Sequence, residues 1–134
     1  LSTSGLLSPE QLGELSAEGY QAVISLLPGD SQWAVPDEPA IISAQGLAFS
    51  YIPVDFEAPC PDDYQAFVKA MDAHAEKKLL VHCAANYRVT AFFGVYAVKV
   101  LGWSEPEARA FIADIWNLEE YPAWQQFVDD LLAA

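Results

Sequence analysis

A cysteine and an arginine lie in a short segment between a strand-like run and a helix-like run of this sequence. The run Leu79-Leu80-Val81 is short and apolar, as a buried strand is, and Val89–Leu101 is long enough for a core helix. The segment between them, His82-Cys83-Ala84-Ala85-Asn86-Tyr87-Arg88, therefore predicts a tight loop that leads into a helix N-terminus. Such a loop binds oxyanions, because its amides and the helix dipole point at one spot.

Cys83 and Arg88 add reactive groups to this predicted anion site. A thiol at a helix N-terminus ionises more readily than a free thiol, whose pKa is about 8.5. The planar guanidinium of Arg88 can hold two oxygens of a phosphate-like group. A nucleophile and an anion cradle coincide, so the pattern indicates a transferase or hydrolase that works through a covalent bond to sulfur.

The loop resembles the signature of the cysteine-dependent protein tyrosine and dual-specificity phosphatases, which is His-Cys, five residues, Arg, then Ser or Thr. Here four residues separate Cys83 from Arg88, and Val89 replaces the hydroxyl residue. The shorter loop is similar to that of a compact bacterial group of phosphatase-like domains. It is also the spacing of the rhodanese sulfurtransferases, so the motif alone leaves phosphorus and sulfur chemistry open.

Two weaker motifs extend the resemblance beyond the loop. Residues 19–26 (GYQAVISL) and 51–55 (YIPVD) match the second and third strands of the phosphatase-like group. The usual Asp-x-Arg and Gly-His-Ile-x-Gly-Ala segments of the rhodaneses are not found in the sequence. The resemblance covers the chain from about Ser4 to Val128, and favours the phosphatase group over the rhodaneses.

The resemblance implies a role for each residue of the loop. Cys83 is the expected nucleophile, and Arg88 binds the phosphate together with the backbone of the loop (Ala84, Ala85, Asn86 and Tyr87). Asn86 stands where the short family loop has Gly, and Asn tolerates a left-handed backbone better than most residues. Tyr87 either lines the pocket or packs against the surface, and the sequence does not choose between these.

Three residues outside that set are expected to support the reaction. His82 either orients the loop by hydrogen bonding or is a purely structural residue at a strand end. Thr90 is a candidate substitute for the hydroxyl that Val89 lacks. The resemblance implies that Asp55, at the end of the third strand, is the general acid; Asp63 competes with it, and the absence of a dedicated acid is the third alternative.

Strand and helix patterns alternate along the chain, which predicts a three-layer α/β fold with a mostly parallel sheet of four to five strands flanked by helices. Strands are expected over residues 22–27, 47–54 and 78–82, and helices over 8–19, 40–45, 62–76, 89–101, 104–115 and 122–131. Residues 28–30 predict a turn and residues 31–39 a loop. The length of 134 residues predicts a single domain over residues 1–134.

The composition weighs against several kinds of partner. With 6 basic and 19 acidic residues, the chain has a formal net charge of −13, which disfavours nucleic acid and anionic membranes. The apolar stretch 89–101 is shorter than the roughly 20 residues that span a bilayer. The two cysteines and two histidines form no metal-binding pattern, so neither a metal nor an organic cofactor is expected. His74 is expected to be exposed or to interact with a helix C-terminus.

We therefore expect a phosphatase that hydrolyses a phosphorylated small molecule or a phosphoprotein. The alternatives are a rhodanese-like sulfurtransferase with a persulfide on Cys83, and an oxyanion-binding module that has lost catalysis. Cys60 is expected to be an ordinary loop cysteine, with a protective disulfide to Cys83 as the alternative. No signal peptide is visible, but the chain begins at Leu1 rather than Met, so the compartment, like the oligomeric state, is left open.

Overall fold

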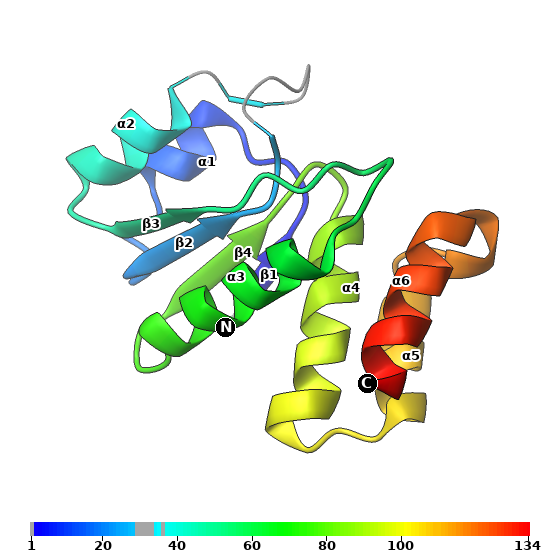
Figure 1. Cartoon of the computed structure of the whole chain (residues 1–134). Coiled ribbons are helices and arrows are strands. Elements are labelled where there is room, and N and C mark those ends of the chain that lie inside the picture. The colour runs from blue at the N-terminus through cyan, green and yellow to red at the C-terminus, as the bar shows by residue number, and fades with distance from the viewer. Residues whose placement is uncertain (1, 29–33, 36) are drawn as a thin grey trace.

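Four parallel strands form the sheet in the part of the chain that the computed structural model describes, residues 2–28, 34–35 and 37–134 (Figure 1). Their order across the sheet is β1-β4-β2-β3. The strands are β1 (Ser2–Ser4), β2 (Ala22–Ser25), β3 (Ala48–Tyr51) and β4 (Leu79–His82). The predicted α/β fold with a parallel sheet is confirmed.

Six α-helices and two short helical turns flank the sheet among the described residues. The α-helices are α1 (Pro9–Gly13), α2 (Glu38–Ala44), α3 (Pro61–Ala73), α4 (Tyr87–Tyr96), α5 (Glu105–Ala113) and α6 (Pro122–Ala133). A π-helical turn, η1 (Ala97–Leu101), extends α4, and a 3-10 turn, η2 (Leu118–Glu120), precedes α6. None of the described helices is both long and apolar enough to cross a membrane.

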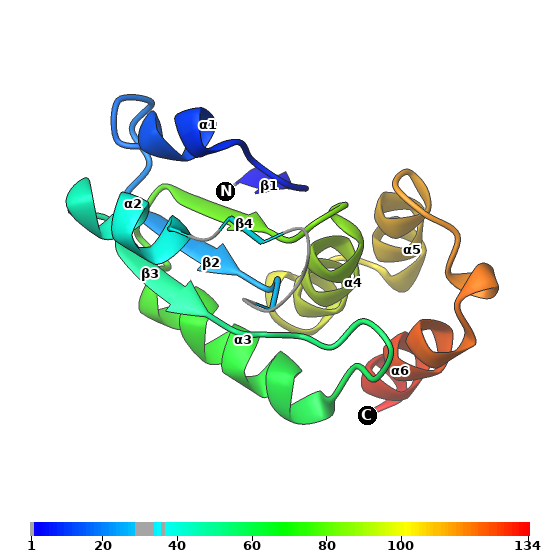
Figure 2. The same cartoon turned by 90° about the horizontal axis from the view of Figure 1, so that it is seen from above.

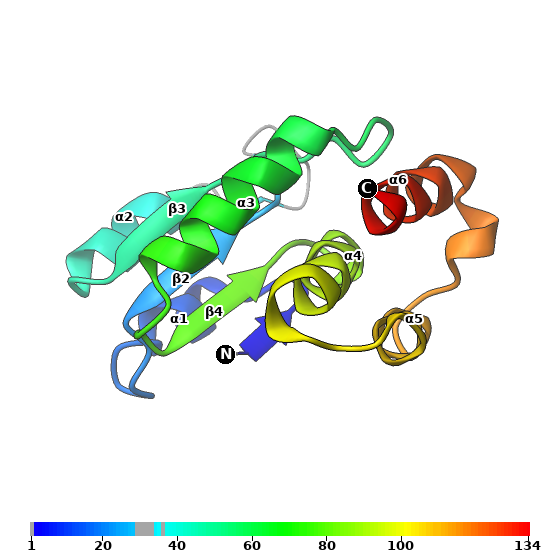
Figure 3. The same cartoon turned by 60° about the horizontal axis from the view of Figure 1, so that its bottom comes forward.

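The sheet separates two apolar layers, because successive side chains of a strand point to opposite faces. Val23 and Leu80 pack with α1 and α2 on one face. Ile24 and Val81 belong to the larger core on the other face, which is built with α3, α4 and α6. Figure 2 shows the sheet between α1 and α3, and Figure 3 shows α4, α5 and α6 grouped at one end of it. The three predicted layers are therefore present.

The helix boundaries follow local signals in the sequence. Ser8 and Ser104 accept hydrogen bonds from the third residues of α1 and α5, forming the capping boxes that the sequence predicts. The predicted helix over residues 89–101 begins two residues earlier, at Tyr87, and its last turn is π-helical. Gly102, with φ of 83°, ends it in a left-handed conformation.

Several predicted boundaries are wrong. α1 ends at Gly13, and turns rather than helix continue to Gly19, whose φ is 90°. β2 and β3 are shorter than predicted, although the Val54 amide still donates to the Leu26 carbonyl at 3.1 Å beyond the ends of both strands. The predicted turn at residues 28–30 lies largely outside the described residues. The predicted loop at 31–39 is described in part, and it ends earlier than predicted because α2 begins at Glu38.

β1 is the strand that the sequence does not predict. It consists of Ser-Thr-Ser, which is short, polar and only half-buried, so it carries no apolar alternation. It pairs in parallel with β4, and Ser4 lies opposite His82. β4 therefore lies between β1 and β2 and ends, at its C-terminal edge, next to Cys83.

Candidate active site

The loop from Cys83 to Arg88, called the 83–88 loop below, lies at the C-terminal edge of the sheet, where β4 passes into α4. Asn86 has φ of 67° and is the non-glycine residue with a left-handed backbone in the described chain. This conformation ends the turn and allows α4 to begin at Tyr87. The amides of a first helical turn have no partner within the helix, so those of α4 face the loop as hydrogen-bond donors.

Cys83 is a free thiol with no exposed surface. It belongs to the apolar core that contains Val81 and Val89. Its amide donates a hydrogen bond of 3.3 Å to the Ser4 carbonyl. The thiol is therefore enclosed by its neighbours, and a substrate reaches it only when these move.

β1 and the residues after it hold the outer side of the 83–88 loop. The Leu6 amide donates to the Ala84 carbonyl at 2.8 Å, and the Asn86 side-chain amide donates to the Thr3 hydroxyl at 3.4 Å. Gly5 lies so close that a Cβ atom on it would be 2.8 Å from the Ala84 oxygen. Residues 3–6 thus shape the loop, and no sequence pattern marks this contact because β1 is short and polar.

Arg88 lies half-buried in the first turn of α4, over an aromatic ring. Its guanidinium carbon is 5.1 Å from the centroid of the Phe56 ring, within the range of a cation–π interaction. Its Nε atom is buried and has no acceptor among the described residues. A buried guanidinium N–H without an acceptor is costly unless an anion accepts from it, so Arg88 retains capacity to bind an oxyanion.

Aromatic side chains surround Phe56 and fix Tyr87. The ring centroids of Tyr87 and Trp116 are 4.6 Å apart with an interplanar angle of 5°, which is a stacked pair. Phe56 also contacts Tyr121 edge-on at 5.5 Å, and its carbonyl accepts a hydrogen bond of 2.7 Å from the Trp124 indole. Tyr87 therefore packs against the buried indole of Trp116.

Thr90 already uses its hydroxyl within the fold. It is fully buried, donates to the Tyr87 carbonyl at 3.1 Å and accepts from the Trp116 indole at 3.0 Å. To act on a phosphocysteine it would have to give up the bond to Tyr87. Val89, which stands where the phosphatases carry a hydroxyl, is fully buried in the core.

His82 forms a buried contact that the sequence did not predict. Its Nε2 lies 2.6 Å from Oε2 of Glu38, at the start of α2, and the two residues are 1% and 6% exposed. Since a carboxylate can only accept, Nε2 donates. Nothing in the sequence marks Glu38, which is one of 19 acidic residues and follows an acidic loop.

The two candidate acids occupy different environments. Asp55 is exposed just after β3, and its carboxylate accepts a 2.9 Å hydrogen bond from the Glu57 amide. Asp63 is half-buried in the first turn of α3; burial, followed by the charge of the neighbouring Asp62, raises the pKa of its carboxyl group. Cys60, the N-cap of the same helix, is a partly exposed free thiol.

His74 is buried, so the expectation that it is exposed is wrong, whereas the alternative, a place at a helix C-terminus, agrees with its position as the C-cap of α3. It is 8% exposed at the end of α3, and its Nε2 lies 3.0 Å from the Ser50 hydroxyl on β3. Burial and, to a smaller extent, Lys77 lower the pKa of His74. It joins α3 to the sheet and is not part of the 83–88 loop.

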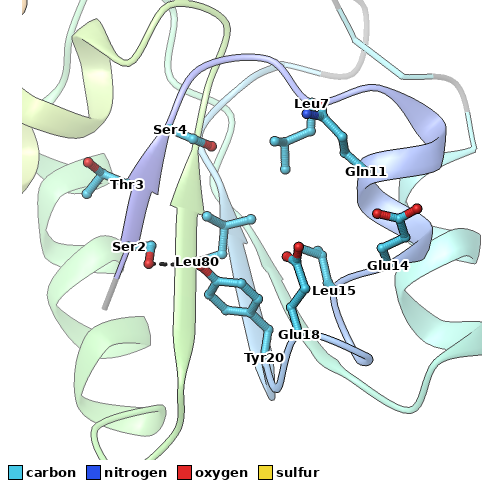
Figure 4. Close-up of a pocket in the computed structure, with 10 residues that line it drawn as sticks. All are labelled: Ser2, Thr3, Ser4, Leu7, Gln11, Glu14, Leu15, Glu18, Tyr20 and Leu80. Atoms are coloured by element: carbon cyan, nitrogen blue, oxygen red, sulfur yellow. Dashed lines mark hydrogen bonds between the residues drawn. The ribbon is translucent and has the colours of Figure 1, made fainter.

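Two cavities in the described structure lie outside the predicted site residues. One of about 290 Å³ lies between β1 and α1, and its lining contains none of the predicted site residues (Figure 4). Another, of about 240 Å³, is lined by Phe56, Trp124 and two exposed carboxylates, Glu57 and Glu120. In the described chain, no three His, Cys, Asp or Glu side chains come together as a metal site would require.

Solved structures with this fold include phosphatases. A Shewanella putrefaciens CN-32 protein, described as a putative phosphatase (DUF442), is 37% identical; the match covers 98% of this chain and 83% of that one, with a TM-score of 0.87. Tk-PTP in its active form is 18% identical over 98% of this chain and 90% of its own, with a TM-score of 0.76. TpbA of P. aeruginosa, solved with pTyr, is 15% identical over 98% of this chain and 84% of its own, with a TM-score of 0.72.

Curated relatives match a smaller part of their own length. The beta-lactamase hydrolase-like protein of Xylella fastidiosa (strain Temecula1) is 29% identical over 101 residues, which are 73% of this chain. The chain spans only 23% of the length of that relative. No family model matches the chain. The similarity over nearly the whole length to the Shewanella protein, together with the shared fold, shows that this chain belongs to the DUF442 family and has the fold of the cysteine-dependent tyrosine and dual-specificity phosphatases.

Proposed function

We propose that this chain hydrolyses a phosphomonoester through a phosphocysteine intermediate on Cys83. One observation carries the proposal. Arg88 lies at the helix N-terminus that follows Cys83, and its buried Nε has no acceptor among the described residues. A tetrahedral dianion would satisfy that donor and the first-turn amides of α4 together. The name of the Shewanella relative, putative phosphatase, supports the same chemistry.

The proposed reaction has two steps. In the first, the Cys83 thiolate attacks phosphorus, the bond to the leaving oxygen breaks, and Asp55 gives that oxygen its proton. In the second, Asp55 takes a proton from water, which attacks the phosphocysteine and releases inorganic phosphate and the thiolate. Arg88 and the amides of Ala84, Ala85, Asn86 and Tyr87 stabilise the equatorial oxygens in both steps.

The buried position of Cys83 adds a condition to this mechanism. A thiol with no exposed surface reacts only after its surroundings move, and we infer that Arg88, in the loop itself, takes part in that movement. Binding of a phosphate dianion supplies a reason for the shift, because Arg88 gains a charged acceptor in exchange for an aromatic face. We infer that anion binding and opening of the site are coupled.

Substitutions of Cys83 and Arg88 test the proposal. The first is assayed with an aryl phosphate as substrate, and the second by anion binding. Cys83→Ser should abolish phosphate release, while Cys60→Ser, the matched thiol control, should leave it unchanged. Arg88→Ala should weaken the binding of vanadate or phosphate, measured by calorimetry, by roughly 2–4 kcal/mol, the scale for losing one partner of a buried charged contact. Unchanged anion affinity in Arg88→Ala would overturn the anion site.

The same proteins decide between the proposed function and its alternatives. A sulfurtransferase would produce thiocyanate from thiosulfate and cyanide, depend on Cys83 and release no phosphate; the four-residue spacing between Cys83 and Arg88 motivates this assay. An oxyanion-binding module without catalysis would bind vanadate through Arg88 and turn over neither substrate. We expect phosphate release to exceed thiocyanate production.

A further inference from the structure

The contact between Glu38 and His82 joins the α2 layer to the strand end from which the 83–88 loop starts. The two atoms, Nε2 of His82 and Oε2 of Glu38, are 2.6 Å apart, which is short even for a charge-assisted hydrogen bond. Both side chains are more than nine-tenths buried. A carboxylate is costly to bury without a partner, so this contact is a built feature of the fold.

The backbone of His82 is fixed on both sides, whereas Cys83 lies outside the strand. In the sheet His82 lies opposite Ser4 of β1 and Ser25 of β2. Its side chain points to the α2 face, and Val81 and Cys83 belong to the core on the other face. The orientation of the His82 ring and the direction of the chain at Cys83 are therefore coupled through a single peptide unit.

We propose that Glu38 is a positioning residue for Cys83. By accepting the Nε2 proton of His82, it fixes the imidazole at the end of β4 and thereby sets the direction in which the chain enters the 83–88 loop. The proposal rests on the proposed role of Cys83 as the nucleophile. Glu38, at the start of α2, thus helps to set the position of the Cys83 thiol.

The proton assignment follows from the surroundings of the ring. The Nδ1 atom of His82 is buried and has no hydrogen-bond partner among the described residues. The contact with Glu38 is thus the one hydrogen bond that the described structure gives the ring, and it selects the tautomer. Without Glu38 the ring would keep no buried partner and would be free to rotate or to change tautomer.

Glu38 could act on Cys83 through its charge or through positioning, and the two predict opposite shifts in the pH at which Cys83 ionises. A nearby negative charge disfavours a thiolate, so removing it would lower the pH at which the thiol ionises. Loss of positioning would instead remove the thiol from the amides and the helix N-terminus, and ionisation would require a higher pH. Glu38→Gln removes the charge but keeps an oxygen that accepts from Nε2, whereas Glu38→Ala removes both.

The test measures the ionisation of Cys83 in a Cys60→Ser background, from the ultraviolet absorbance of the thiolate as a function of pH. The Cys83→Ser variant is subtracted to remove tyrosine ionisation. We expect Glu38→Ala to move the midpoint to higher pH and to lower kcat/KM for an aryl phosphate by roughly tenfold to a hundredfold, mostly in kcat. In Glu38→Gln the midpoint and kcat/KM should both stay near the values of the unsubstituted protein.

Nitrogen-15 NMR gives a second measurement, and its first result needs only the unsubstituted protein: a slowly exchanging proton on Nε2 of His82. That proton should persist in Glu38→Gln and be lost in Glu38→Ala. Ile42→Ala is the matched control, because Ile42 is fully buried in α2 and packs in the apolar cluster that contains Val23 and Leu80. It should lower stability while leaving the thiol midpoint and the Nε2 proton in place.

Three results would overturn the proposal. A lower midpoint in Glu38→Gln would show that charge acts directly; an equal shift in Ile42→Ala would show general loosening of α2; and an Nε2 atom without a proton would remove the hydrogen bond itself. Failure of the proposed function is distinguishable from these. A protein that releases no phosphate can still show the thiol shift and the Nε2 proton, since neither requires turnover.

Discussion

Single residues in this protein divide between reaction chemistry and the fold, and two aspartates are the clearest case. Asp55 is exposed in the turn after β3, whereas Asp63 is half-buried, and burial raises the pKa of its carboxyl group. A general acid must hold its proton near the working pH, and the raised pKa of Asp63 is a shift in that direction. Asp55 remains our proposed acid because of its place after the third strand. Substitution of each aspartate distinguishes which of them donates the proton.

Asp55→Asn should lower the hydrolysis of an alkyl phosphate or phosphotyrosine by about 10²–10⁴-fold, the usual contribution of a general acid. The loss should be much smaller for an aryl phosphate with an acidic leaving group, which departs without a proton. Steady-state kinetics on the two substrate classes measure this. The matched variant is Asp63→Asn: if it shows the selective loss and Asp55→Asn does not, the acid is Asp63, and if neither does, the reaction has no dedicated acid.

His74 should make stability depend on pH. Burial lowers its folded-state pKa below the ordinary value of 6.5, so the unfolded chain binds the proton more readily. The contribution of neutral His74 to the free energy of unfolding is therefore complete above pH 6.5, and it is lost as the pH falls from 6.5 towards the folded-state pKa. Urea denaturation at about pH 7.5 and about pH 5.5 should show a larger loss for the natural protein than for His74→Asn. Equal losses in both proteins would contradict this origin.

At the scale of elements, β1 and α2 hold the 83–88 loop from its two sides. β1 supplies the Ser4 carbonyl to Cys83, while α2 supplies Glu38 to His82. Neither contact could be read from the sequence, because β1 is a three-residue polar strand and Glu38 lies in an acidic stretch. Gly5, directly after β1, leaves no room for a Cβ atom beside the Ala84 oxygen.

Gly5→Ala should impair the 83–88 loop more than the fold. The new Cβ would lie 2.8 Å from the Ala84 oxygen and 3.3 Å from the Ala85 Cα, so the loop backbone has to move. A shift of that size in a catalytic loop costs on the order of tenfold or more in activity, whereas overpacking costs about 1–3 kcal/mol in stability. Phosphate release and thermal denaturation measure the two effects separately.

Gly13→Ala is the control for that substitution. A Cβ on Gly13 meets nothing within 4 Å, so the variant should keep full activity and gain up to about 1 kcal/mol of stability from the stiffer unfolded chain. Equal activity of Gly5→Ala and Gly13→Ala would show that the 83–88 loop tolerates displacement by β1.

At the scale of the whole molecule, the formal charge of −13 opposes the approach of a phosphate ester. The cavity beside Phe56 places two exposed carboxylates, Glu57 and Glu120, near the side chain that covers Arg88. Local charges at that cavity should matter more than distant ones, because charges are screened beyond about 8–10 Å at moderate salt.

Neutralising Glu57 and Glu120 together, as Glu57→Gln with Glu120→Gln, should raise kcat/KM for an aryl phosphate, and added salt should shrink the difference. The matched control, Glu10→Gln with Glu14→Gln, changes the net charge equally, at the start and the C-cap of α1, which packs on the opposite face of the sheet from α6. Kinetics at about 0.01 M and about 0.15 M ionic strength compare them. An equal gain in both double variants would show that only net charge matters.

Most of the fold could be predicted because its main elements carry local signals. The apolar runs that form β2 and β4, the capping boxes at Ser8 and Ser104, and Gly102 after the long helix all act within a few residues of themselves. The boundaries were less accurate, since the ends of β2 and β3 depend on which strand lies beside them. β1 was missed because its pairing with β4 is a contact between residues almost eighty positions apart.

The sequence by itself determined the 83–88 loop, its place between a buried strand and a helix, and the coincidence of Cys83 with Arg88, because these depend on neighbours in the chain. Only the tertiary structure decided what surrounds them: the burial of Cys83, the Phe56 ring against Arg88, the Trp116 indole on Thr90 and the Glu38 carboxylate on His82. Each of these contacts joins elements that are distant in sequence. Their partners are selected by packing across the sheet, which no local pattern encodes.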